Sequence, residues 1–265
     1  MIRVYVESIG LMAPGLQGWT DSKAVLTGAT TYNGQALPRL SPTYLPPTER
    51  RRASTSVRLA VQVAQEALEA STRDAADLAT VFASSDGDTE IIHNLCTSLA
   101  TEEKLISPTR FHNSVHNAPA GYWHIAAGSP ASSNSICAWD QSFAVGLMDA
   151  AVQVSTEQRS VMLCAYDMVV PEPLNKVRCT SIPFATAIIL SAQKPAQGLA
   201  ELRLSLKATD NDVSKVNIVE LDNLVSKNPM ARALPLLSRI AGKDPGHVLL
   251  QSTGSQKLCI EVDRP

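Results

Sequence analysis

The stretch Ser132-Ser133-Asn134-Ser135-Ile136-Cys137-Ala138-Trp139-Asp140 joins a short strand candidate to a long apolar segment. Residues 132–137 are predicted to form the strand. Residues 140–154 are predicted to form a helix, and because it is apolar on nearly every side we expect it to be covered on all faces. Gly128, ahead of the strand, stands where the C-terminal cap of a preceding helix belongs. The stretch therefore predicts a helix, a strand and a buried helix in succession.

The alternation of strands and helices continues on both sides of this stretch. The elements predicted before it are a strand near residues 4–9 that ends at Gly10, one amphipathic helix from Glu49 to Ala70, a strand at 78–83, and helices near 88–100 and 118–127. The elements predicted after it are strands at 161–165, 184–190 and 202–206, a helix from Asn228-Pro229, and a hairpin over 247–262. This order favours an α/β fold with a mostly parallel sheet and helices on both faces.

Composition excludes several classes of protein. The chain has 265 residues, of which 45% are apolar and 18% charged, which is typical of a globular protein that needs no metal or disulfide to fold. The net charge of −2 gives no basic footprint for nucleic acid. The five cysteines are spread without a CxxC pair, which favours a reducing cytoplasmic location. No apolar run approaches the roughly 20 residues that span a bilayer, so we expect no membrane insertion.

The familiar cofactor and metal motifs are absent from the sequence. It contains neither GxGxxG nor GxxxxGK[ST], so we expect no nucleotide cofactor, and it lacks the GxSxG of serine hydrolases. His112 and His116 are four residues apart, but Asn113 and Asn117 argue against one continuous helix through them. We therefore expect no metal site, and instead a polar loop that hydrogen-bonds locally or across an interface.

Cys137 has two interpretations. At the end of a strand and just before a helix, its thiol would feel the helix dipole, which favours a reactive thiolate. Alternatively it is a small core residue, because cysteine is often fully buried. Asp167, after a later strand, could orient a partner group or cap its loop.

Two segments resemble the β-ketoacyl synthases, the condensing enzymes of thiolase-like fold. Ser107-Pro108 with Asn117-Ala118-Pro119-Ala120-Gly121 resembles their SP…N-x-A-G segment, and residues 128–137 resemble the run that delivers their acyl-accepting cysteine. The resemblance implies a thiolase-like βαβαβαββ half over residues 1–192. It also implies that residues 193–265 are a reduced C-terminal segment, with a short helix and a hairpin, packed on the same domain.

The chain departs from active ketosynthases beside and after the cysteine. Trp139 and Asp140 stand where those enzymes have small residues and a glycine, and neither the HGTGT-type motif nor the later His or Asn motif is present. In the family these groups hold the thioester carbonyl and stabilise the carbanion formed on decarboxylation, a type of charge stabilisation that dominates catalysis. The resemblance thus implies that Cys137 occupies the nucleophile-equivalent position without catalytic residues around it.

A closer similarity covers nearly the whole chain. Residues 45–52, 107–117 and 229–237 are similar to the truncated, chain-length-factor subunits of bacterial aryl polyene biosynthesis. This similarity implies a heterodimer with a full-length ketosynthase, which extends a polyene on an acyl carrier protein by fatty-acid-type elongation.

The similarity also implies a set of interface and acyl-tunnel residues. The strand that contains Ser135 would pair with the partner, and bulky side chains beyond it would stop the growing chain. The residues expected at the interface or tunnel are His112, Asn113, His116, Asn117, Ser135, Cys137, Trp139 and Phe143. Two alternatives stay open: an independent acyltransferase in which Cys137 uses His112 or His116 as base, and a purely scaffolding subunit.

Overall fold

A mixed β-sheet forms the centre of the computed structural model, which describes residues 1–178 and 180–264. The strands in this part of the chain are β1 (Ile2–Ala13), β2 (Leu16–Gln17), β3 (Ala79–Ala83), β4 (Ser133–Ile136), β5 (Val161–Asp167), β6 (Phe184–Ser191), β7 (Ala200–Ala208), β8 (Gly246–Gln251) and β9 (Gln256–Asp263). Their order across the sheet is β4-β3-β5-β6-β1-β7-β9-β8, and β2 pairs with the end of β1. The two edges of the sheet are therefore β4 and β8.

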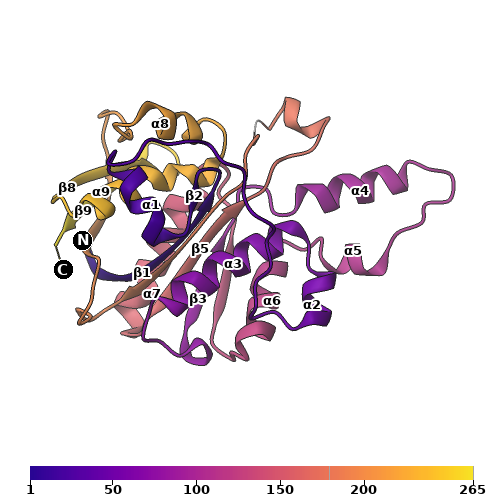
Figure 1. The fold of residues 1–265 in the computed structure, drawn as a ribbon, viewed down its shortest axis with the longest axis horizontal. Helices are drawn as coiled ribbons and strands as arrows, with labels where there is room; N and C mark the ends of the chain where they lie inside the picture. Colours follow the sequence, from indigo (N-terminus) through magenta and orange to yellow (C-terminus); the bar gives the residue numbers. More distant parts are fainter. Residues whose placement is uncertain (179, 265) are drawn as a thin grey trace.

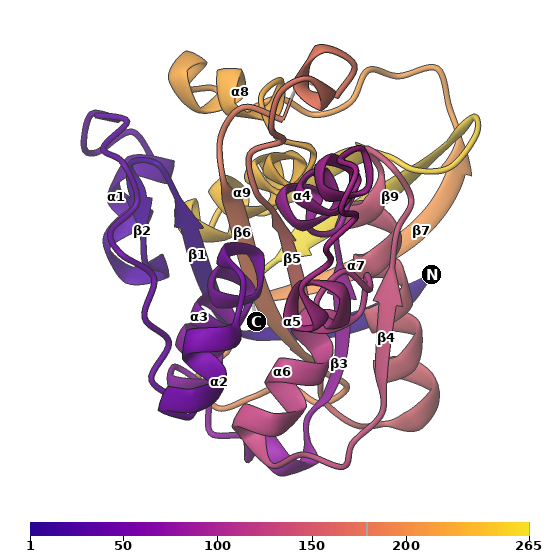
Figure 2. The same cartoon turned by 90° about the vertical axis from the view of Figure 1, so that its right-hand side faces the viewer.

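Helices cover both faces of this sheet. They are α1 (Trp19–Leu26), α2 (Pro47–Arg52), α3 (Thr55–Glu69), α4 (Thr89–Leu99), α5 (Pro108–His112), α6 (Ala118–Ala127), α7 (Ser142–Glu157), α8 (Val219–Val225) and α9 (Leu234–Gly242), with 3-10 turns η1 (Ala75–Asp77), η2 (Leu174–Lys176) and η3 (Pro229–Ala233). One buried apolar cluster joins the sheet to α1, α7, α8 and α9, and a second joins it to α3 and α6 (Figures 1 and 2). The predicted α/β fold with helices on both faces is confirmed.

The strand directions differ from the prediction of a mostly parallel sheet. The strand β3 is parallel to β4 and β5, but β6 is antiparallel to β5 and β1, and β7, β9 and β8 continue antiparallel. Among its described residues the loop 168–183 carries the short η2 turn instead of a crossover helix, so β6 returns alongside β5 in the opposite direction. The prediction is therefore wrong outside β3, β4 and β5.

Two helices replace the single helix predicted over residues 49–70. The helix α2 ends at Arg52, and α3 begins at Thr55 after a break in the chain direction. The cause is Ser54, whose backbone is extended and whose hydroxyl accepts a hydrogen bond from the N–H of Val57 at 3.2 Å, which caps α3.

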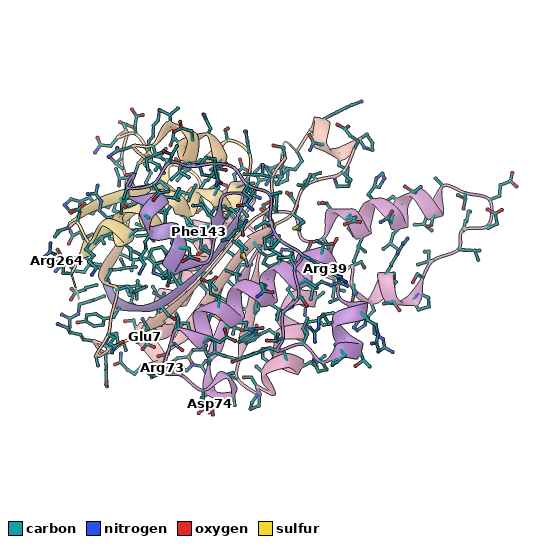
Figure 3. All side chains as sticks on the ribbon, viewed as in Figure 1. Glu7, Arg39, Arg73, Asp74, Phe143 and Arg264 are labelled. Carbon is teal, nitrogen blue, oxygen red and sulfur yellow. The ribbon has the colours of Figure 1, made fainter. Side chains whose placement is uncertain are left out.

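The strand β1 does not end at Gly10 but continues to Ala13. A Cβ atom at Gly10 would lie 2.2 Å from the carbonyl oxygen of Val63 in α3, so glycine here lets the helix approach the strand closely. A register shift after Val6 marks a bulge in the same strand, and the buried Glu7 at this bulge pairs with Arg73 (Figure 3).

The helices α4 and α5 extend together away from the sheet (Figure 1). We call residues 89–117 the arm. Its exposed apolar side chains are Ile92, Leu99, Leu105, Ile106, Phe111 and Val115. Exposed apolar patches of this kind mark interaction surfaces. Within residues 1–178 and 180–264, no helix combines the length and the apolar character needed to cross a membrane.

The C-terminal residues close the β8 edge of the sheet. The strand β7 pairs directly with β1, so the sheet continues without a break past residue 192. At the far edge, the N–H of Ser214 donates to the carbonyl of Leu249 in β8 at 2.8 Å, and the N–H of Leu249 donates to the Ser214 hydroxyl at 2.9 Å. A loop of the chain itself therefore covers part of this edge.

Candidate functional site

The edge strand β4 offers an open backbone surface. The carbonyl oxygen of Ser132 accepts a hydrogen bond from the N–H of Thr80 in β3 at 3.0 Å. That of Ile136 accepts one from the N–H of Ser84, directly after β3, at 3.1 Å. Because backbone groups alternate sides along a strand, those of Ser133 and Ser135 point away from the sheet. The described part of the chain places no strand on that side, and the β4 side chains are exposed or half-buried. Such an edge is ready to pair with another chain.

A tight turn after β4 displays an aromatic side chain. Trp139 has a left-handed backbone with φ of 53°, and the residue is 58% exposed. The hydroxyl of Ser142 fixes the turn, because it accepts a hydrogen bond from the N–H of Ala138 at 2.8 Å and donates one to the carbonyl of Trp139 at 2.6 Å. The fold thus holds a large aromatic group at the surface beside the open edge.

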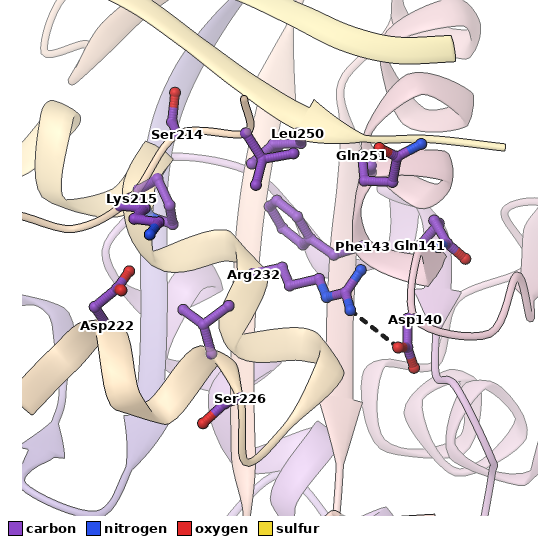
Figure 4. Close-up of a pocket in the computed structure, with 14 residues that line it drawn as sticks. Asp140, Gln141, Phe143, Ser214, Lys215, Asp222, Ser226, Arg232, Leu250 and Gln251 are labelled. Carbon is purple, nitrogen blue, oxygen red and sulfur yellow. Dashed lines mark hydrogen bonds and ion pairs between the residues drawn. The ribbon is translucent and has the colours of Figure 1, made fainter. Parts of the chain in front are cut away.

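Four charged side chains from separate segments of the chain form ion pairs next to this turn. Arg178, from the loop 168–183, donates hydrogen bonds of 2.8 and 2.9 Å to the carboxylate of Asp86 and also pairs with Asp140. The other oxygen of Asp140 accepts a hydrogen bond from Arg232 at 2.9 Å (Figure 4). The guanidinium carbon of Arg178 lies 4.2 Å from the centre of the Trp139 ring, a cation–π contact. We call these four charged residues the ion-pair network.

Phe143 lies in the interior, away from the exposed Trp139. It is fully buried near the start of α7 (Figure 3). With Arg232 and Leu250 it lines a pocket of about 420 Å³ between α7 and the C-terminal residues (Figure 4). The structure therefore places these two predicted tunnel residues in different surroundings.

The carboxylate of Asp167 ties the ends of β3 and β5 together. It accepts hydrogen bonds from the Ser84 hydroxyl at 2.6 Å, and from the N–H and hydroxyl of Ser85 at 3.0 and 2.5 Å. Burial raises the pKa of Asp167 to about 7, although the hydrogen bonds from both serines act in the opposite direction. The thiol of Cys137 donates to the carbonyl of Ser85 at 3.1 Å, and Nε2 of His116 lies 3.2 Å from the carbonyl of Ser84. Cys137 and His116 therefore contact the same two-residue segment.

The other predicted residues lie at the end of α5 and just before α6. Asn113 is buried, with its side-chain N–H donating to the carbonyl of Arg52 at 2.9 Å and its oxygen accepting from the Tyr122 hydroxyl at 3.1 Å. His112 and Asn117 are exposed and line a groove of about 650 Å³ between α5 and α6. The structure thus brings His112 and Asn117 together and places His116 nearer to Cys137.

Sequence reasoning missed the ion-pair network. Arg178 comes from the loop 168–183 and Arg232 from the 3-10 turn η3, both far along the chain from the two aspartates, and no local spacing marks them. A signal was nevertheless present, because Asp86 and Asp140 each follow one of the two neighbouring parallel strands β3 and β4. Carboxylates that meet at one end of a sheet require cations nearby to offset their repulsion.

Comparisons with known proteins agree with this architecture. A family model described as "Beta-ketoacyl synthase, N-terminal domain" matches residues 19–241. No curated protein matches the chain.

Several solved structures share the fold. A chain of the ketosynthase ApeO in complex with its chain length factor ApeC, from Xenorhabdus doucetiae, is 22% identical, with a TM-score of 0.74 over 98% of this chain and 100% of that one. The complex AntDE:AntF, a type II PKS acyl-carrier protein with its ketosynthase bound to the hexaketide, gives 12% identity and a TM-score of 0.76 over 100% and 99%. The ishigamide ketosynthase/chain length factor gives 9% and 0.75 over 100% and 99%. The family match over residues 19–241 shows that this chain belongs to the β-ketoacyl synthase N-terminal domain family.

Proposed function

We propose that this chain is a non-catalytic, chain-length-factor-like subunit. It pairs with a full-length ketosynthase and shapes the tunnel that holds a polyene or fatty-acid-type chain during its elongation on an acyl carrier protein. The observation that carries the proposal is the open edge of β4, with the exposed Trp139 and the apolar arm nearby. Structures of similar fold support it, among them a ketosynthase in complex with its chain length factor and the ishigamide ketosynthase/chain length factor.

The surroundings of Cys137 favour a subunit without its own condensation chemistry. Its thiol donates to a backbone carbonyl, and within residues 1–178 and 180–264 no imidazole is hydrogen-bonded to it. Three residues after Cys137 in the chain, Asp140 forms an ion pair with Arg178. A charged group that is already paired in this way is poorly placed to stabilise a developing enolate. These contacts argue against Cys137 acting as an independent acyltransferase nucleophile.

The proposed pairing uses β4 as the seam. Ser135 would donate and accept backbone hydrogen bonds across it, as edge strands do when two sheets join. The groove lined by His112 and Asn117 would continue the partner's tunnel, and Trp139 would limit its length by bulk. The direct pairing of β7 with β1 supports treating residues 193–265 as a reduced segment of the same domain.

A basic surface beside the arm suits the carrier protein. Arg50, Arg51 and Arg52 lie on α2, and the hydrogen bond from Asn113 to the carbonyl of Arg52 joins α2 to the end of α5, which carries Arg110. Glu49 is the nearby acid on α2, and it lies 3.6 Å from Arg52. Since the whole chain is slightly acidic, this local excess of cations favours a partner with an acidic surface. We assign that partner as the carrier protein, and added salt should weaken its binding.

Co-expression with a full-length ketosynthase tests the proposal. We expect a stable one-to-one complex on a sizing column, whereas the isolated chain should neither decarboxylate malonyl carrier protein nor form a carbon–carbon bond. The Cys137→Ser variant is the matched control and should leave the activity of the complex unchanged. Turnover by the isolated chain that is lost in this variant would contradict the proposal. A complex whose products ignore substitutions in the groove would indicate a scaffold instead.

A further inference from the structure

The conformation of Trp139 is costly, and burial does not offset the cost. A left-handed backbone costs a residue with a bulky side chain about 1–2 kcal/mol. Trp139 is 58% exposed, so its side chain gains little from the hydrophobic effect, whereas Trp19 and Trp123 are 6% and 0% exposed. The contacts that offset this cost must therefore be the hydroxyl of Ser142 on the backbone and the guanidinium of Arg178 on the ring.

Arg178 is itself fixed from two sides. Asp86 follows β3 and Asp140 follows β4, and both carboxylates hold the same guanidinium. The side chain of Arg178 is 12% exposed, and Arg232 in turn fixes the second oxygen of Asp140. A planar guanidinium held at two corners presents its face in one direction, which an ammonium group cannot do. The orientation of the indole is thus coupled to the ends of two strands.

We propose that Arg178 is a positioning residue that fixes the indole of Trp139 in one orientation, and thereby sets the length of the acyl chain that the complex releases. This inference rests on the proposed function, in which the chain shapes the partner's tunnel. Arg178 would not touch the reacting atoms. An indole free to rotate about its two side-chain torsions would leave the tunnel end at variable depth, whereas an indole stacked on a fixed cation ends it at one depth.

The Arg178→Met variant tests the inference, because methionine fills space but cannot pair with carboxylates or stack as a cation. The first readout is acrylamide quenching of tryptophan fluorescence in the isolated chain. Since Trp19 and Trp123 are buried, the quenched emission reports on Trp139. We expect the Stern–Volmer constant to rise in Arg178→Met and to rise less in Arg178→Lys, which keeps the charge and loses the planar fork.

The second readout is the product distribution of the complex with a full-length ketosynthase. We expect the single dominant chain length of the wild type to be replaced by a spread toward longer products. The Arg203→Met variant is the control, because Arg203 on β7 also pairs with carboxylates, those of Glu201 on β7 and of Glu261 and Asp263 on β9, at the other end of the sheet order from β4. It should change neither readout.

Each outcome separates this inference from the proposed function. Unchanged quenching in Arg178→Met, or raised quenching with an unchanged product distribution, overturns the positioning role even when the complex assembles. If Arg178→Met fails to fold, Arg178→Lys gives the same test with a smaller expected change. If the wild-type chain forms no complex, the proposed function fails and the inference fails with it, whereas a normal complex with unchanged products counts against the inference alone.

Discussion

The two edges of the sheet end in different ways. At β8 the chain covers its own edge, with Ser214 bonded to both backbone groups of Leu249. At β4 the described residues leave the outward backbone groups open, and Trp139 stands exposed beside them. Exposed edges invite aggregation, and proteins usually shield them. Because this fold can shield an edge and does so on one side, the open side is best explained as a surface for a partner.

The strongest way to break this comparison is to close the β4 edge by substitution. The Ser135→Pro variant removes an outward N–H, a position at which an edge strand tolerates proline. We expect ketosynthase binding to weaken at least ~100-fold, about 3 kcal/mol, because the partner's edge loses hydrogen bonds in a desolvated interface. Titration by isothermal calorimetry measures this effect. The Ser135→Ala variant keeps the N–H and should bind normally, and equal binding by both variants would exclude backbone pairing at this position.

The carboxylate of Asp167 supports the open edge. Its hydrogen bonds with Ser84 and Ser85 hold the end of β3, and β3 is the strand with which β4 pairs. Burial raises the pKa of Asp167 from 3.8 to about 7 in the folded chain. Between these values the folded state binds a proton that the unfolded state has released. The contribution of Asp167 to the free energy of unfolding is therefore largest below pH 3.8 and is lost as the pH rises to about 7. From about pH 5 to about pH 8 the wild type should lose about 2–3 kcal/mol relative to Asp167→Asn.

Urea unfolding of both proteins across this pH range checks the prediction. The comparison between the two proteins cancels the titration of every other group that the substitution leaves alone. Parallel pH profiles for wild type and Asp167→Asn would show that Asp167 keeps its ordinary pKa in the folded protein.

The arm carries exposed apolar side chains, which should contribute to binding but not to folding. Phe111 is 64% exposed and lines the groove between α5 and α6. The Phe111→Ser variant should bind the ketosynthase about 10-fold more weakly, since an aromatic side chain buried in an interface contributes about 1–2 kcal/mol. Val219 on α8 is similarly exposed at 69%, and Val219→Ser should have no effect on binding. Equal losses in the two variants would contradict a role specific to the arm.

The smallest effect is expected at the closed edge. The Ser214→Ala variant removes the hydrogen bond from the N–H of Leu249 and keeps the backbone bond. We expect a loss of about 1 kcal/mol in unfolding free energy and a drop of about 2–4 °C in the thermal midpoint. Calorimetry of the free chain measures both, and ketosynthase binding should not change. Weaker binding by Ser214→Ala would remove the distinction between the two edges.

The predictable parts of the fold are those whose signals are local. The strand near Ser135, the helix that contains Phe143 and the hairpin that turns at Thr253-Gly254 all follow from runs of neighbouring residues, and all are present. Serine is a residue type that caps helices, but the apolar periodicity continues after Ser54 and favours a single helix over residues 49–70. The local sequence around Gly10 predicts the end of a strand, because the close approach of α3 that requires this glycine leaves no trace in neighbouring residues.

The candidate site was predictable only in part. Cys137 and Trp139 are adjacent to the strand that sequence analysis placed correctly, so their position at its end follows from it. The pairing of Arg178 with Asp86 joins segments more than ninety residues apart. The positions of the two aspartates after neighbouring strands indicate that a cation is needed, but no local pattern identifies Arg178 as that cation. Likewise, the burial of Phe143 depends on the C-terminal residues that cover α7, whose packing could not be derived from their composition.

Hydrogen–deuterium exchange of β4 in the free chain and in the ketosynthase complex tests the central claim most directly. The account predicts that the amides of Ser133 and Ser135 exchange rapidly in the free chain and become protected in the complex, while those of β8 stay unchanged. A stable complex in which the β4 amides still exchange as rapidly as in the free chain would contradict it.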